Sequence, residues 1–159
     1  MTAQILDRTL ESYRIGDPGG AYPIFDATGS TIFPGRWNSA TSPMIYSSER
    51  YSTALLEKLA HGSGRLPPNQ HYARIMIPAG IPYEYFDEAR TPGWDTATPT
   101  VSRSFGDAWQ RSKRSLILIV PSVLARIDCN ILINPTHPDF RKIQAGLHKP
   151  VFWDKRLFL

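Results

Sequence analysis

The sequence contains one cysteine in 159 residues, so no disulfide can form within the chain. Cys129 lies in the apolar segment 127–133, where a small buried thiol in a reducing compartment is expected. No stretch is apolar over the length of a membrane span, and residues 1–10 carry Asp7 and Arg8 where a signal peptide has its apolar centre. These absences predict a cytoplasmic protein without a membrane segment.

Motifs for metals and for common nucleotide cradles are also missing. No ligands have the HxxxH, HxxE or CxxC spacing of metal sites, and there is no GxGxxG or Walker A sequence. Ser122 does not lie in the GxSxG elbow of a serine hydrolase. The sequence therefore predicts no bound metal. The histidines stand far apart, at His61, His71, His137 and His148.

Composition and length favour one folded domain over residues 1–159. Hydrophobic residues make up 42% and charged residues 20%, and there is neither a repeat nor a low-complexity segment. The net charge is +4, a mild attraction toward anions. The basic run 111–114 suits either a solvated helix end or phosphate contacts, and nucleic acid binding is not expected from it.

Hydrophobic periodicity predicts a mixed α/β fold with about six or seven strands and two main helices. The helices are expected over 49–61, with an N-cap at Ser47 or Ser48 and a stop at Gly62 and Gly64, and over 101–114. The apolar run 116–120 predicts a central strand covered on both faces. Further extended segments are expected at 13–15, 31–33, 44–46, 71–77, 127–133, 151–153 and 156–158, with 81–99 as a long loop, a lid or a partner surface.

Several polar residues stand where a site could form, although each also has an ordinary structural explanation. Arg36 follows Gly35 at a tight turn, and Ser122 follows the buried strand 116–120. Arg14 ends a short strand, where a surface charge is common. Glu57 points away from the apolar stripe of its helix, as a solvated residue or a cleft residue would. Residue pattern alone leaves these alternatives open.

A series of short motifs, in this order, resembles the RES domain family over about residues 13–152. The motifs are Tyr13-Arg14, Gly35-Arg36-Trp37-Asn38, Ile45-Tyr46-Ser47, Ala54-Leu55-Leu56-Glu57, Gly106-Asp107-Ala108-Trp109, Val120-Pro121-Ser122, and Asn130-Ile131-Leu132-Ile133-Asn134-Pro135 with His137-Pro138. That family takes its name from an arginine, a glutamate and a serine, and consists largely of bacterial toxins encoded beside an antitoxin.

The resemblance implies an α/β fold like that of ADP-ribosyltransferases, with two packed β-sheets around an NAD cleft and flanking helices. It implies the toxin of a type II toxin-antitoxin system that cleaves the nicotinamide-ribose bond of NAD by hydrolysis or phosphorolysis and arrests growth. NAD would be a substrate, and the implied partner is an antitoxin with an Xre-like helix-turn-helix domain that covers the cleft. Whether the chain is a homo-oligomer in such a complex is left open.

The resemblance also assigns roles to individual residues. Glu57 would be the catalytic carboxylate, and Arg14 and Arg36 would hold the pyrophosphate with their guanidinium forks. Tyr46, with Tyr13, would contact the nicotinamide end, and Ser122 would position the ribose or a phosphate. The residues leave two alternatives open: a protein ADP-ribosyltransferase that uses NAD, and a non-catalytic basic binding module.

Overall fold

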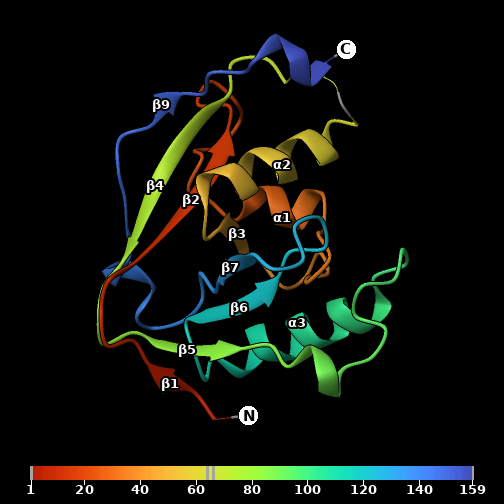
Figure 1. Cartoon of the computed structure of the whole chain (residues 1–159). Helices are drawn as coiled ribbons and strands as arrows, with labels where there is room; N and C mark the ends of the chain where they lie inside the picture. Colours follow the sequence, from red (N-terminus) through yellow and green to blue (C-terminus); the bar gives the residue numbers. More distant parts are fainter. Residues whose placement is uncertain (1, 64, 66, 159) are drawn as a thin grey trace.

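The computed structural model describes residues 2–63, 65 and 67–158. In chain order the regular elements are β1 (Gln4–Ile5), β2 (Leu10–Gly16), α1 (Thr28–Ile32), β3 (Ile45–Ser48), α2 (Tyr51–His61), β4 (His71–Ile77), β5 (Pro82–Tyr85), η1 (Glu88–Arg90), α3 (Thr100–Ser112), β6 (Ile117–Pro121), β7 (Cys129–Ile133), η2 (Phe140–Lys142), β8 (Gln144–Ala145), β9 (Lys149–Pro150) and η3 (Lys155–Phe158). The predicted α/β class is confirmed (Figure 1).

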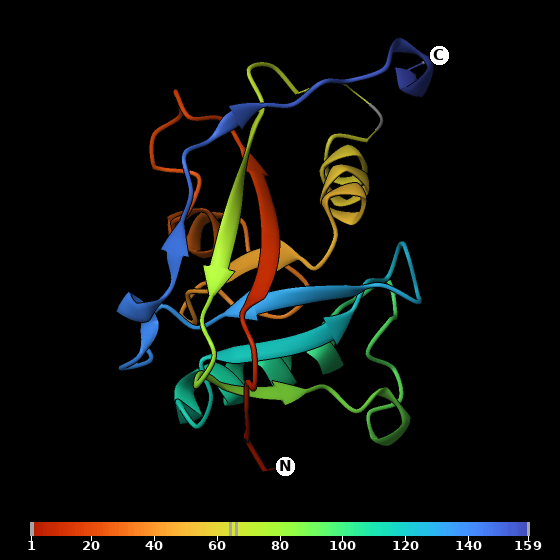
Figure 2. The same ribbon diagram turned by 60° about the vertical axis from the view of Figure 1, so that its left-hand side comes forward.

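Hydrogen bonds join the strands of the described residues into one sheet in the order β1-β5-β6-β7-β3-β2-β4-β8, with β9 also on β4. The two sheets that the family resemblance implies correspond to two halves of this sheet. The halves meet where β2 pairs with β3, and this pairing consists of a single residue pair, Tyr13 with Ser48. In contrast, every residue of β2 is paired with a residue of β4. Figure 2 shows β2 and β4 crossing the direction of β6 and β7.

The core lies on both sides of the β6–β7 half, as the apolar run 116–120 predicts. Ile117 and Ile119 pack in one cluster with Ile131, while Leu118 packs in another with Trp37 and Trp109. Helix α3 covers the second face (Figure 1). Helix α2 packs on β2 and β3 instead, so the two helices approach the sheet at different places. Because β2 and β3 join the two halves of the sheet, α2 packs at their junction.

The helix predictions hold with small changes at the ends. The first main helix begins at Tyr51, because Ser47 and Ser48 belong to β3 and neither acts as an N-cap. Arg50 occupies the N-cap position without a side-chain hydrogen bond. Gly62 ends the helix as expected, and Gly64 lies outside the described residues.

Three extended or irregular segments are predicted wrongly. Residues 31–33 are not extended: Thr31 and Ile32 belong to α1, within which Ser30 Oγ and Thr31 Oγ1 donate to carbonyls three residues earlier. The loop 81–99 contains β5 and η1. Residues 151–158 form no strand, and Phe152 is 83% exposed, since the paired segments are the short β8 and β9 before it.

Two smaller expectations also change. Cys129 is half-buried, and Ile127 is 98% exposed, because β7 begins only at Cys129. In the basic run 111–114, Arg114 Nε donates to Glu84 Oε1 at 2.8 Å. Glu84 itself is buried and accepts a further bond from Ser115, so part of the run neutralises an internal carboxylate.

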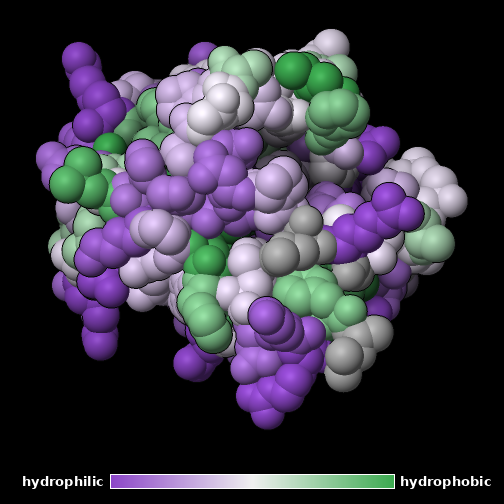
Figure 3. All heavy atoms as spheres, turned by 90° about the horizontal axis from the view of Figure 1, so that it is seen from above, coloured by the Kyte–Doolittle hydropathy of each residue, from purple (hydrophilic) through white to green (hydrophobic). Residues whose placement is uncertain are grey.

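The surface at the top of Figure 1 is mixed in character. Seen from above in Figure 3, small hydrophobic patches are separated by hydrophilic residues. Among the residues that the structure describes, no helix is long and apolar enough to cross a bilayer.

Candidate active site

The centre of the candidate site is the carboxylate of Glu57, which α2 presents toward the ends of β6 and β7. Its Oε1 accepts a hydrogen bond from Ser122 Oγ at 2.9 Å and another from Asn130 Nδ2 at 2.8 Å. Among the described residues no donor reaches Oε2. One carboxylate oxygen is therefore fixed by the protein, while the second remains available to a ligand.

Ser122 is held by the turn that follows β6. Its side chain is fully buried, and its Oγ accepts from the backbone N–H groups of Leu124 at 3.2 Å and Ala125 at 3.0 Å. Because two amides already point at this oxygen, the hydroxyl hydrogen is directed at Glu57. The Ser122 hydroxyl therefore caps the turn 122–125 and also contacts Glu57.

Asn130 is oriented by the neighbouring strand. In the antiparallel pairing of β3 with β7, Asn130 lies opposite Ser48, and Ser48 Oγ donates to Asn130 Oδ1 at 2.8 Å. This bond fixes which end of the amide is the donor, so Nδ2 faces Glu57. Asn130 was not predicted as a site residue. The available signal was a polar amide inside the apolar strand 127–133.

A second contact ties α2 to the same turn. Thr53 Oγ1, one helical turn before Glu57, donates to Asp128 Oδ2 at 2.7 Å, and Arg50 Nε lies 3.4 Å from Asp128 Oδ1. Asp128 O in turn accepts from Ser122 N. The start of α2 and the turn 122–128 are therefore positioned together, which keeps Glu57 and Ser122 in register.

The tight turn 35–38 is organised by one buried amide. Asn38 Oδ1 accepts from Gly35 N at 2.9 Å and from the Tyr46 hydroxyl at 2.7 Å. Its Nδ2 donates to the carbonyls of Ser30 and Ser39. All bonding positions of the Asn38 side chain are in use, so the turn has one defined conformation. The structure thus explains the Gly-Arg-Trp-Asn motif by backbone geometry.

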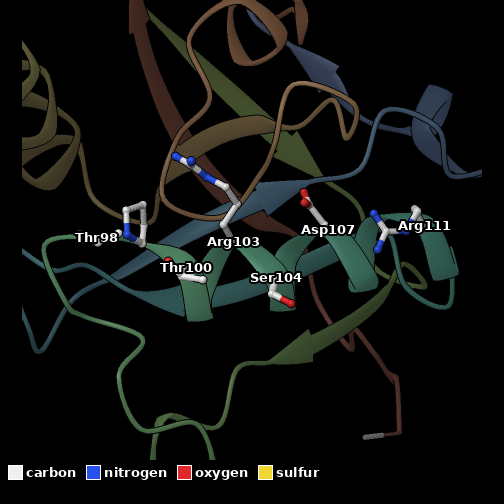
Figure 4. Close-up of a pocket in the computed structure, with 7 residues that line it drawn as sticks. Thr98, Thr100, Arg103, Ser104, Asp107 and Arg111 are labelled. Atoms are coloured by element: carbon white, nitrogen blue, oxygen red, sulfur yellow. The ribbon is translucent and has the colours of Figure 1, made fainter.

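Helix α3 holds the other side of this turn. Ser102 Oγ donates to Arg36 O at 2.9 Å, Arg103 Nη2 donates to Gly35 O at 2.8 Å, and Asp107 Oδ1 accepts from Ser39 N at 2.8 Å. Figure 4 shows Arg103 and Asp107 projecting from α3 toward the loop above it. Gly106 permits this approach, because a Cβ there would lie 2.7 Å from the Trp37 carbonyl carbon.

Arg36 is anchored at one end of its guanidinium only. Nη1 donates to Trp94 O at 3.0 Å and to Thr96 O at 2.8 Å, while Nε and Nη2 bond to no described residue. The Nε–Nη2 edge is the side of a guanidinium that binds a carboxylate or phosphate with two parallel bonds. The geometry of Arg36 suits the predicted anion contact.

Arg14, which is predicted to hold the pyrophosphate, donates to three backbone carbonyls. Nε donates to Ile24 O at 2.6 Å, Nη1 to Tyr46 O at 2.8 Å and Nη2 to Asp26 O at 3.4 Å. Burial lowers the pKa of this guanidinium. Three of its N–H groups therefore connect the segment 24–26 to Tyr46 in β3.

The two tyrosines of the prediction lie in different surroundings. The Tyr46 hydroxyl donates to Asn38 and accepts from Trp37 N at 3.0 Å, and burial raises its pKa, so it remains neutral. The Tyr13 ring packs edge-on against Tyr51 at 5.9 Å, with the Arg74 guanidinium above it at 5.8 Å. Tyr46 belongs to the Arg36 turn, whereas Tyr13 belongs to the α2 interface.

Two pockets border this region without containing its centre. A pocket of 420 Å³ is lined by residues of α3 and of the segment just before it, among them Thr98, Arg103 and Arg111 (Figure 4). A second pocket of 320 Å³ is lined by Arg14, Lys58 and the segment 15–24. Glu57, Arg36, Tyr46 and Ser122 line neither of them. Burial and the nearby Arg14 charge lower the pKa of Lys58, which lines the second pocket together with Arg14 and Asp17.

Comparison with known proteins places the chain in a family. The RES domain matches residues 11–154. The chain is 35% identical to a Prs ADP-ribosylating toxin of Sphingobium sp. (strain YBL2), and the match covers 94% of this chain and 97% of the relative. It is 32% identical to Toxin Res of Pseudomonas putida, over 87% and 95% of the two chains. The chain therefore belongs to the RES domain family.

A solved structure supports the same fold. A chain of the M. tuberculosis MbcT-MbcA toxin-antitoxin complex superposes with a TM-score of 0.69, covering 94% of this chain and 87% of that one, at 14% identity. The fold and the family thus agree, and the protein is related over most of its length to proteins named as toxins.

Proposed function

We propose that this protein is a RES toxin that consumes NAD by breaking the bond between nicotinamide and ribose. The observation that carries the proposal is the half-occupied carboxylate of Glu57: Oε1 is fixed by Ser122 and Asn130, and Oε2 has no donor among the described residues. A carboxylate held in this way is preorganised to accept hydrogen bonds from ribose hydroxyls without reorienting.

The chemistry requires a negative group at that place. As the C1′–N bond breaks, its electron pair goes to the nicotinamide nitrogen, which becomes neutral, and positive charge develops on the ribose ring. A carboxylate bonded to the ribose stabilises this charge mainly in the transition state. Water then adds to C1′ and loses a proton, giving ADP-ribose; inorganic phosphate in place of water would give the phosphate ester at the same C1′.

The surrounding residues take supporting parts in this proposal. The open Nε–Nη2 edge of Arg36 would bind the pyrophosphate. Ser122 and Asn130 would hold the Glu57 carboxylate in one rotamer, because both donate to its Oε1. Arg14 would position Tyr46 and the segment 24–26 by donating to their backbone carbonyls. The described residues contain no cluster of metal ligands, and the steps above are assigned to side chains of the protein itself.

A second candidate is transfer of ADP-ribose to a protein. It is favoured by the name of the Sphingobium relative, a Prs ADP-ribosylating toxin that is 35% identical to this chain. The bond broken in NAD is the same, and a side-chain nucleophile of the target replaces water. Arg36 and Glu57 would have the same roles in both reactions, so the two functions differ in the acceptor.

We also propose that an antitoxin with an Xre-like helix-turn-helix domain binds this chain and covers the site. The support is the MbcT-MbcA toxin-antitoxin complex that shares the fold. The partner would control toxicity in the cytoplasm by blocking entry of NAD.

The test is nicotinamide release from NAD by the purified chain, freed of any partner. Three acceptors are compared: water alone, inorganic phosphate, and purified Prs, the protein in the name of the Sphingobium relative. Release in every mixture supports NAD cleavage; stimulation by phosphate indicates phosphorolysis, and release only with Prs, together with an added mass on Prs, indicates protein modification. If folded protein releases no nicotinamide with any acceptor, the proposal is wrong.

A further inference from the structure

Between Arg36 and the Glu57–Ser122 pair runs a continuous series of contacts that involves two charged residues without an assigned role. Asp95 lies between Trp94 and Thr96, the two residues whose carbonyls anchor Arg36. Its Oδ2 accepts from Arg126 Nη1 at 2.8 Å. Arg126 belongs to the turn 122–128, which begins at Ser122. The pair therefore joins the segment that holds Arg36 to the turn that holds Ser122.

Arg126 makes two further contacts that give this connection a fixed geometry. Its Nε donates to Val123 O at 2.7 Å, and its guanidinium lies over the Trp94 ring at 5.6 Å. Trp94 is only 6% exposed and stacks on Trp37, next to Arg36 in the turn 35–38. The guanidinium thus contacts the Val123 carbonyl, the Trp94 ring and the Asp95 carboxylate at once.

We propose that Asp95 and Arg126 form a clasp that sets the distance between the anion-binding edge of Arg36 and the Glu57 carboxylate. The inference rests on the proposed function, in which these two groups bind opposite parts of one substrate. Neither clasp residue touches the substrate, so both are positioning residues. When the clasp opens, the segment 93–99 and the turn 122–128 separate, and NAD can no longer contact Arg36 and Glu57 together.

The carboxylate side of the clasp is the suitable place for a test. Asp95→Asn keeps the shape and removes the charge, while Arg126 retains Val123 and Trp94. The matched control is Asp154→Asn, which removes an exposed ion pair of the same kind with Arg156, at 2.9 Å, in the C-terminal segment. Both carboxyl groups have pKa values lowered by their arginine partners, so both pairs are ionised at neutral pH.

Two measurements are made on each variant. We expect Asp95→Asn to raise KM for NAD about twofold to fivefold at low salt, the range of an exposed ion pair, with a smaller effect on kcat. The ratio of KM in Asp95→Asn to KM in the wild type should approach one at about 1 M salt, because screening opens the clasp in the wild type too. Hydrogen exchange at the amides of Leu124 and Ala125, which bond to Ser122 Oγ, should be faster in Asp95→Asn only.

Exchange is read from the protein alone, so it separates failure of the clasp from failure of the proposed function. Faster exchange with no turnover in any variant, wild type included, would support the clasp and reject NAD cleavage. Exchange rates at Leu124 and Ala125 equal to wild type, or a KM that does not differ from that of Asp154→Asn, would overturn the clasp.

Discussion

Replacing Gly106 with alanine should separate α3 from the turn that carries Arg36. The added Cβ would lie 2.7 Å from the Trp37 carbonyl carbon and closer still to its oxygen. Non-bonded carbon atoms rest about 3.5 to 4.0 Å apart, so the helix or the turn must move by on the order of 1 Å. Neither can yield by a rotamer change, because the obstructing atoms belong to the backbone.

The magnitude follows from the bonds that this movement would break. Overpacking costs about 1–3 kcal/mol. The bonds from Ser102 to Arg36, from Arg103 to Gly35 and between Asp107 and Ser39 would contribute roughly 1 kcal/mol each if lost. Alanine returns about 1 kcal/mol through its helix propensity. The net loss is therefore about 3–5 kcal/mol of unfolding free energy.

The assay is urea unfolding and thermal unfolding of Gly106→Ala, followed by nicotinamide release from whatever fraction stays folded. Gly146→Ala is the matched control, because a Cβ there would meet only Arg74 O at 3.5 Å, an ordinary contact. The melting temperature should fall by roughly 6–20 °C, at about 2–4 °C for each kcal/mol. Unchanged stability in Gly106→Ala, with full activity, would refute the account of how the turn is held.

Two further predictions concern buried polar groups. Tyr46→Phe removes a hydroxyl bonded to Asn38 and to Trp37 N, so the unfolding free energy should drop by about 1–2 kcal/mol in urea titration; an unchanged midpoint would contradict this. Burial lowers the pKa of His137, whose Nδ1 accepts from Asp139 N. Because the unfolded chain then binds this proton more readily, stability should fall as pH is lowered through about 6.5, and His137→Gln should lose that part of the pH dependence in melting curves. Equal pH profiles for the two proteins would show that His137 has no such effect.

Sequence pattern was sufficient where burial alone decides the structure. The run 116–120 is apolar on both faces and became the central strand β6. Periodicity failed where polar groups replace apolar ones. The strand β5 was missed because Glu84 is buried at an inward position and is neutralised by Arg114, so the expected alternation is absent.

Local hydrogen bonding explains another failure. The β-branched residues Thr31 and Ile32 favour an extended segment, yet α1 forms there. Asp26 Oδ1 accepts from Thr28 N, and the Ser30 carbonyl accepts from Asn38. These contacts satisfy the ends of a five-residue helix that propensity alone would not support.

The site could be predicted only in part from the sequence, because its contacts join residues that are far apart in the chain. Periodicity placed Glu57 on the polar side of its helix, which describes a solvated residue equally well. Its contacts with Ser122 and Asn130 connect positions 65 and 73 residues apart. Such juxtapositions depend on the pairing of β3, β6 and β7, which no local pattern encodes. The family resemblance supplied Glu57 and Ser122, while Asn130 required the structure.

The most direct test of the central claim is the rate of nicotinamide release by Glu57→Gln compared with Glu49→Gln, an exposed glutamate just before the same helix. Glutamine keeps the size of Glu57 and removes the charge that would stabilise the ribose cation. A single electrostatic contact of this kind contributes about 3 kcal/mol, so kcat should fall on the order of 100-fold in Glu57→Gln. Glu49→Gln should retain the wild-type rate. Equal rates in the two folded variants would contradict the assignment of Glu57 as the catalytic carboxylate.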